Sequence, residues 1–308
     1  MTQKSLSGRG WAELALLSLV WGGSFLAIRL ALDEIGPLWV VAHRVGWAAV
    51  ALWAVVIASG QAVPRGWRIW GAFLLAGLLN NVLPFSLIAW GQLHIPTGLA
   101  AILNAATAIF GVLVAALAFA DERLTARRAA GVSLGFAGVV TAIGWRALGE
   151  LDIRSLAQLA VIGASLSYAL AGAWARSALR GLRPEVAAAG TLAAAAALAL
   201  PLAWAVEGRP ALALEPTTWG ALGYIAVMAT AFAYLLYFRL VASAGSGNVL
   251  LCTLMIPPVA IALGALVLGE TLRPAAYGGF ALLAGGLLVL DGRLLGRRRA
   301  VEAGPAGG

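Results

Sequence analysis

The feature that most constrains this chain is the length of its stretches without Asp, Glu, Lys or Arg. Such stretches occur at residues 14–28, 45–64, 69–120, 129–145, 155–175, 186–206, 216–238, 240–269 and 274–290. A helix of roughly 20 apolar residues crosses a bilayer core about 30 Å thick. Hydrophobic residues make up 62% and charged residues 11% of the chain, whereas soluble domains are about 25% charged. The sequence therefore excludes a soluble globular domain and a disordered chain, and predicts an all-α integral membrane protein.

The two longest stretches, at residues 69–120 and 240–269, must be divided. The first is too long for one helix, and the second follows the preceding stretch with only Arg239 between them. Polar residues, Gly and Pro punctuate helices, and they gather at residues 92–96 and 243–247. Dividing the chain there predicts ten transmembrane helices, at residues 11–32, 37–59, 69–91, 96–120, 129–148, 157–180, 184–206, 218–242, 246–268 and 275–291.

The basic residues are distributed unequally between alternate loops. Arg-rich segments at residues 121–128 and 293–299 fall on the same side as the N-terminus. The loops on the other side carry only Arg146, Arg154, Arg209 and Arg273. Because cytoplasmic loops are enriched in Lys and Arg, both termini are predicted to be cytoplasmic. The net charge of +8 thus indicates orientation in a membrane, and nucleic acid is not an expected partner.

The second half of the chain repeats the first. A shift of 147 places Arg29 on Arg176, Pro37 on Pro184 and Trp21 on the aromatic Tyr168. A shift of 148 places Asp121–Leu124 on Gly269–Leu272, Gly131 on Gly279, Leu134 on Leu282 and Gly138 on Gly286. Arg, Pro and Glu are scarce here, so their joint agreement indicates two homologous halves. We divide the chain into residues 1–148, residues 149–292 and a cytoplasmic tail at 293–308.

Five helices in each half place the two halves in opposite orientations in the membrane. The loop at 121–128 has three Arg on the predicted inner side, while its equivalent at 269–274 has one on the outer side. Inverted repeats are the construction of many secondary transporters, which expose a midplane site alternately to each face. The repeat therefore predicts a transporter that works by alternating access.

This pattern resembles the drug/metabolite transporter superfamily, and within it the ten-helix EamA-type exporters. The resemblance is carried by Trp21–Arg29 (WGGSFLAIR) with Pro37 and Arg44, by Gly269–Leu272 (GETL) with Gly279 and Gly286, and by the weaker first-half copy Glu122–Leu124. It covers nearly the whole chain and specifies the substrate poorly. The nearest likeness is to YddG-type exporters of aromatic and other neutral amino acids. The resemblance implies a central cavity lined by predicted helices 1, 3, 4, 6, 8 and 9, with helices 5 and 10 peripheral.

Neutral polar side chains interleaved with aromatic ones remain at the middle depth of the predicted helices. Amides and hydroxyls bond an ammonium or carboxylate without the cost of a buried charge, and aromatic faces accept a ring or an ammonium. Each also has a structural alternative, since Ser and Thr bond their own helix and Asn joins helices. The predicted substrate-binding residues are Trp21, Ser24, Asn80, Asn81, Ser86, Asn104, Thr107, Ser165, Tyr168, Thr230, Tyr234, Tyr237, Asn248 and Cys252. They predict an uncharged cavity for a neutral or zwitterionic substrate.

Prolines and glycines interrupt several predicted helices. Pro84, Pro257 and Pro258 remove backbone hydrogen bonds, so they either contribute to gating or simply bend their helices. Glycines that permit close helix approach are interpreted as packing residues, namely Gly131, Gly135, Gly138, Gly278, Gly279, Gly285 and Gly286.

Two charged residues bear on the mechanism. Glu13 lies roughly 5 Å into the first predicted helix, and we interpret it as an interfacial structural residue, with a proton site as the alternative. Arg44 lies about 10 Å along its helix. It is interpreted as a snorkelling or helix-pairing residue, with phosphate binding as the alternative.

The sequence as a whole predicts a secondary transporter that exports small neutral metabolites across a bacterial inner membrane, above all amino acids with aromatic or large apolar side chains. The expected partners are a small-molecule substrate and the lipid bilayer, and a monomer is expected because one chain contains both halves. The single Cys252 permits no cysteine-based metal site, and no catalytic residue, metal or cofactor is expected. A proton-coupled multidrug or cation antiporter and a non-transport membrane enzyme or scaffold remain as alternatives.

Overall fold

The computed structural model describes residues 7–120, 124–144, 153–244 and 252–291. Every regular element in these residues is helical, which confirms the predicted all-α class. Helices that continue one another group into ten segments in this part of the chain, each overlapping one predicted transmembrane helix. Seven of the segments are long and apolar enough to cross a membrane, and the helices at Cys252–Leu268 and Pro274–Leu290 are apolar but shorter.

The segments divide into two sets of five. The first set is α1 (Gly8–Ala31), α2 (Pro37–Ala58), α3 (Trp67–Gly77) with η1 (Leu78–Val82) and α4 (Leu83–Gln92), α5 (Thr97–Asn104) with α6 (Thr107–Ala118), and α7 (Ala126–Ile143). The second set is α9 (Ile153–Ala178), α10 (Pro184–Glu207), α11 (Pro216–Gly223) with η2 (Tyr224–Phe232) and α12 (Ala233–Ala244), α14 (Cys252–Leu268), and α15 (Pro274–Asp291).

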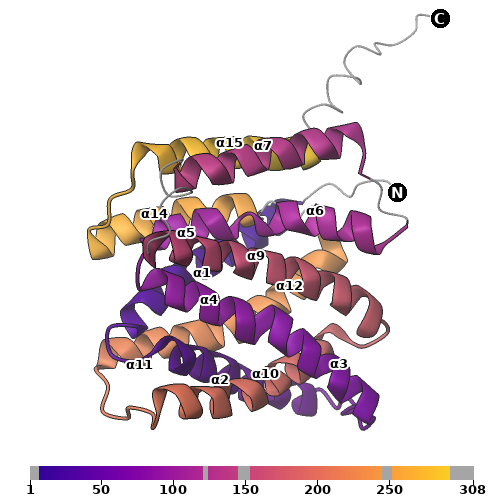
Figure 1. Ribbon diagram of the computed structural model, residues 1–308. Helices are drawn as coiled ribbons and strands as arrows, with labels where there is room; N and C mark the ends of the chain where they lie inside the picture. The colour runs from indigo at the N-terminus through magenta and orange to yellow at the C-terminus, as the bar shows by residue number, and fades with distance from the viewer. Residues whose placement is uncertain (1–6, 121–123, 145–152, 245–251, 292–308) are drawn as a thin grey trace, which may run out of the picture.

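Equivalent helices of the two sets pack against one another. The pair α7 and α15 lies at one edge of the bundle, and the pair α2 and α10 lies at the opposite edge (Figure 1). The remaining contacts match in the same way: α1 contacts α14 and the α11–η2–α12 segment, while its equivalent α9 contacts the α5–α6 segment and α4. The contacts between helices therefore follow the sequence repeat.

The glycines of α7 and α15 make the closest of these contacts. Gly131 lies against Gly286 and Leu290, whereas Gly138 lies against Gly279 and Leu283. The residue numbers rise along one helix as they fall along the other, so the two helices run antiparallel. Small residues let helix backbones approach closely. The packing role predicted for Gly131, Gly138, Gly279 and Gly286 is thus confirmed, whereas it is wrong for Gly278, where a Cβ would meet nothing within 4 Å.

Buried apolar side chains form two cores. One core joins α7 and α15 to α14, the α5–α6 segment, α9 and part of α1, and the other joins α2 and α10 to α4, η2 and the end of α1. Tyr168 and Tyr224 pack against both cores. Side chains between the two cores therefore lie near the centre of the bundle.

Two segments contain π-helical turns, which the sequence does not reveal. In η1, the N–H of Leu83 donates to the carbonyl of Leu78, five residues earlier. Pro84 follows at once and has no N–H to bond the carbonyl of Asn80 in α-helical register. The 148-residue shift places 78–82 on residues 226–230, inside η2. Both halves thus have a π-helix at equivalent positions, and π-helical turns are frequent at functional sites.

Candidate substrate site

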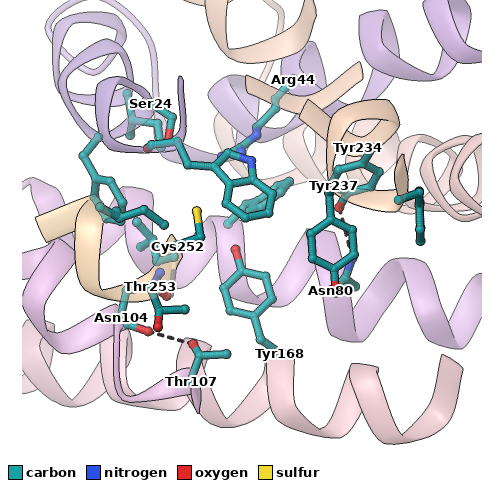
Figure 2. Close-up of a pocket in the computed structure, with 17 residues that line it drawn as sticks. Ser24, Arg44, Asn80, Asn104, Thr107, Tyr168, Tyr234, Tyr237, Cys252 and Thr253 are labelled. Carbon is teal, nitrogen blue, oxygen red and sulfur yellow. Dashed lines mark hydrogen bonds between the residues drawn. The ribbon is translucent and has the colours of Figure 1, made fainter. Parts of the chain in front are cut away.

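A cavity of about 430 Å³ lies between the two cores. Figure 2 shows the side chains that surround it. They are Trp21, Ser24, Phe25, Ile28, Arg44, Asn80, Phe85, Ile88, Asn104, Thr107, Tyr168, Tyr234, Tyr237, Phe238, Cys252, Thr253 and Ile256. Its size falls within the ~300–1,000 Å³ of pockets that bind small molecules.

Nine of the predicted residues line this cavity: Trp21, Ser24, Asn80, Asn104, Thr107, Tyr168, Tyr234, Tyr237 and Cys252. They belong to α1, η1, α5, α6, α9, α12 and α14, which correspond to predicted helices 1, 3, 4, 6, 8 and 9. The cavity therefore lies where the family resemblance implies, and α2 contributes one additional residue, Arg44.

The motif on α1 attaches the first half to the π-helix of the second. The indole Nε1 of Trp21 donates to the carbonyl of Ala229 at 3.2 Å, and the hydroxyl of Tyr224 donates to the carbonyl of Val20 at 2.9 Å. A Cβ on Gly23 would lie 2.5 Å from that same hydroxyl. Glycine at 23 therefore leaves room for the Tyr224 hydroxyl, and an alanine there would displace this hydroxyl from its hydrogen bond to Val20.

A cluster of amides supports Tyr234. The Nδ2 atoms of Asn80 and Asn81 each donate to its hydroxyl oxygen at 3.0 Å. Asn81 is fully buried behind the lining residues, so it fixes the tyrosine instead of facing the cavity. The phenol oxygen accepts from both amides, and its own O–H is left to donate.

The helix break between α5 and α6 faces the cavity at Asn104. The carbonyl of Asn104 accepts hydrogen bonds from the hydroxyls of Thr107 at 2.7 Å and Ser165 at 3.3 Å, and Figure 2 shows the bond from Thr107. The side-chain Oδ1 of Asn104 is buried and has no hydrogen-bond partner among the described residues. Ser165 therefore stabilises the break from behind, while the Asn104 side chain carries an unused acceptor at the cavity wall.

The other predicted residues that the structure describes do not line the cavity. Ser86 has a buried Oγ without a hydrogen bond in the described part of the chain, and Thr230 is fully buried behind Arg44. Pro84 is buried beside η1, and Pro257 and Pro258 lie inside α14. Asn248 falls outside the described residues.

The expectation of an uncharged cavity is wrong at Arg44. This side chain is 7% exposed and lines the cavity, so it does not snorkel to an interface. Its Nε donates to the Thr230 hydroxyl at 2.9 Å, which joins α2 to η2 as a helix-pairing residue would. Its Cζ also lies 3.6 Å from the centroid of the Phe85 ring. The described lining thus contains one fixed positive charge among neutral polar, apolar and aromatic groups.

The apolar residues of the lining do not follow from the pattern of polar and aromatic side chains at middle depth. Phe25 and Ile28 follow Trp21 and Ser24 at helical spacing, so the face of α1 was readable from the sequence. Phe85, Ile88, Phe238 and Ile256 are the other apolar lining residues, and the polar Thr253 also lines the cavity without having been predicted. Nothing in the sequence indicates that α2 turns Arg44 inward.

Carboxylates lie outside the cavity, at helix ends. Glu13 forms ion pairs with Arg9 at 3.0 Å and with Arg239. Glu207 accepts from the first N–H groups of α2, at Leu38 and Trp39, and Glu270 accepts from the N–H and hydroxyl of Thr97 at the start of α5. Among the residues that the structure describes, no Asp or Glu lines the cavity, and no three His, Cys, Asp or Glu side chains come together as a metal site would require.

Comparisons with known proteins agree with this architecture. A probable terminal-alkyne amino-acid exporter of Streptantibioticus cattleyicolor is 31% identical over 296 residues, which are 96% of this chain and 97% of that protein. A probable amino-acid metabolite efflux pump of Salmonella typhimurium is 27% identical over 89% of this chain and 92% of its own length. A solved crystal structure with 21% sequence identity has the same fold, with a TM-score of 0.68 over 94% of this chain and 98% of that chain.

The family match covers both halves of the chain separately. The EamA-like transporter family matches residues 9–144 and again residues 155–290. Together the two matches include nearly every helix described above. The chain therefore belongs to the EamA-like transporter family and is a multi-pass membrane transporter.

Proposed function

We propose that this transporter exports neutral amino acids with aromatic or large apolar side chains across the bacterial inner membrane by alternating access. The observation that carries the proposal is the composition of the cavity. Aromatic rings of Trp21, Tyr168 and Tyr237 surround it, hydroxyls and amides lie between them, and Arg44 is the one charged residue in the described part of its lining. Such walls suit an apolar side chain together with polar main-chain groups.

Alternating access is supported by the way equivalent helices meet. Leu38 at the start of α2 contacts Glu207 at the end of α10, so this pair runs antiparallel as α7 and α15 do. A two-fold axis in the membrane plane produces antiparallel pairs of equivalent helices, and such an axis is typical of inverted-repeat carriers. We propose that residues 1–148 and 149–292 are these two halves, that all ten segments cross the bilayer, and that both termini and the tail at 293–308 are cytoplasmic.

The names of the relatives support the substrate class. The proteins of Streptantibioticus cattleyicolor and Salmonella typhimurium are named a probable exporter and a probable efflux pump for amino acids or their metabolites. We extend that class to this chain as a proposal and infer a monomer, because both halves of the cavity come from one chain. Membership of a transporter family also favours transport over an enzyme or a scaffold.

Antiport of lipophilic cations is not supported by the charges of the site. Proton-driven cation exporters are best served by a buried carboxylate that binds either proton or substrate. Glu13 is instead paired with two arginines near a helix end, and Arg44 would repel a cation in the cavity.

Transport by the purified protein tests the proposal directly. Proteoliposomes would be loaded with unlabelled amino acid, and entry of labelled phenylalanine, leucine, glutamate or lysine would be measured by counterflow against vesicles without protein. We expect flux of phenylalanine and leucine well above that of glutamate and lysine. Flux of no neutral amino acid above that of empty vesicles would reject the proposal, and repetition with and without a pH gradient would show whether protons are coupled.

A further inference from the structure

Arg44 is a buried cation without an acidic partner in the described part of the chain. The side chain is 7% exposed, and its contacts there are Thr230 and the ring of Phe85. Burial of an unpaired charged side chain within the hydrocarbon core of a membrane costs several kcal/mol. The structure thus keeps an energetically unfavourable charge at the wall of a cavity whose other described lining residues are neutral.

The contacts of Arg44 fix its orientation. The hydroxyl of Thr230 donates its hydrogen to the carbonyl of Ile225 at 2.7 Å, an acceptor five residues earlier in η2. Its oxygen therefore remains to accept from Nε of Arg44 at 2.9 Å. With Nε occupied and Phe85 beneath the guanidinium, the terminal Nη1 and Nη2 groups have no hydrogen bond to the described residues.

Planar guanidinium groups bind carboxylates through paired N–H donors. Tyr168 points its hydroxyl into the same cavity (Figure 2), and the Tyr234 hydroxyl has an O–H left to donate. Trp21 and Tyr237, with ring centroids 5.9 Å apart, supply an apolar wall. The cavity therefore combines a cationic guanidinium and two hydroxyl donors with an aromatic wall.

We propose that Arg44 binds the carboxylate of the transported amino acid and is the residue that selects carboxylate-bearing substrates. The inference rests on the proposed function and adds the chemical group that the protein recognises. A ligand that lacks the carboxylate leaves the guanidinium buried and unpaired, which penalises its binding.

Paired analogues of phenylalanine test the proposal in proteoliposomes. N-acetylphenylalanine retains the carboxylate and phenylalaninamide retains the ammonium, and each would compete against labelled phenylalanine. We expect the wild-type protein to bind the amide roughly 10- to 100-fold more weakly than phenylalanine, which is the effect of losing one charge-assisted hydrogen-bonded contact. Arg44→Gln should remove this preference, whereas Arg44→Lys should retain part of it because an ammonium keeps the charge without the paired donors.

Arg176→Gln serves as the matched control. Arg176 is exposed, lies over the ring of Phe119 with Cζ 4.1 Å from its centroid, and does not line the cavity. We expect the Arg176→Gln variant to prefer phenylalanine over its amide as strongly as the wild-type protein does. Binding of phenylalanine and its amide to each variant in nanodiscs, measured by calorimetry, would separate recognition from transport.

The outcomes distinguish this inference from the proposed function. Wild-type transport of phenylalanine with equal binding of the amide overturns the role of Arg44 and leaves the function standing. If Arg44→Gln slows transport of all ligands alike and keeps the wild-type preference, Arg44 only joins α2 to η2 and the inference is wrong. No transport of any neutral amino acid by the wild-type protein rejects both.

Discussion

The indole of Trp21 donates a hydrogen bond to the main-chain carbonyl of Ala229, 208 residues away along the chain. The donor belongs to the motif that identifies the family, and the acceptor lies in the π-helix η2. Trp21 also lines the cavity and packs near Tyr237. One side chain therefore connects the substrate site, the contact between the two halves and an irregular part of the second half.

Replacement of Trp21 by Phe should weaken transport without unfolding the protein. The ring near Tyr237 is kept, while the hydrogen bond to Ala229 is lost, which costs about 1 kcal/mol or about fivefold in an equilibrium. Counterflow of labelled phenylalanine would measure the effect. Trp11→Phe is the control, because Trp11 is 48% exposed at the start of α1. An equal loss in both variants would contradict the role given to Trp21.

Replacement of Gly138 by Ala should destabilise the pairing of α7 with α15. An added Cβ would lie 2.5 Å from the main-chain nitrogen of Leu283 and 2.6 Å from the carbonyl oxygen of Gly279, and backbone atoms have little freedom to move away. Overpacking of this kind costs about 1–3 kcal/mol. Gly278→Ala is the matched control, since a Cβ there meets nothing within 4 Å. The variants would be heated in detergent, and the temperature at which half of the monomer peak in size-exclusion chromatography is lost would be compared. Equal temperatures for the two variants would refute the close contact.

Replacement of Glu13 by Gln should leave transport largely intact. Glu13 is held by Arg9 and Arg239 near a helix end, and ion pairs of exposed arginines contribute about 0–1 kcal/mol. Counterflow with and without a pH gradient measures the variant. Abolished transport together with competition by lipophilic cations would instead support the antiport mechanism.

The proposed opposite orientation of the two halves in the membrane predicts different accessibility for equivalent loops. Thr125→Cys and Arg273→Cys would be introduced separately into a Cys252→Ala protein that still transports, and intact cells would be treated with a membrane-impermeant maleimide. We expect labelling at 273 and protection at 125, because the loop at 121–128 is assigned to the cytoplasm. Labelling of both positions from outside would disprove the inverted arrangement.

The charge-free stretches, divided where polar residues, Gly and Pro gather, predicted the helices well because a bilayer constrains the length and polarity of a helix that crosses it. Polar residues at middle depth also predicted nine of the cavity residues, among them Asn104 and Tyr234. The family resemblance, carried by residues such as Gly22 and Glu270, is confirmed by the match to both halves.

Features that depend on packing between distant segments could not be predicted from the sequence. Arg44 turns inward because Thr230 and Phe85 receive it, and neither partner is near it in the chain. Asn81 lies behind Tyr234, although Asn80 next to it lines the cavity, because neighbouring residues of a helix point about 100° apart.

The π-helices in η1 and η2 have a consequence for how the cavity can change shape. A π-helical turn holds one residue more than an α-helical turn, and each α-helical residue corresponds to about 100° of rotation and about 1.5 Å of rise. If that extra residue migrates along the helix past Asn80 or Tyr234, the side chain rotates out of the lining by roughly 100° while the ends of the helix stay fixed. The wall can thus exchange polar for apolar groups by a local twist, without tilting a whole segment.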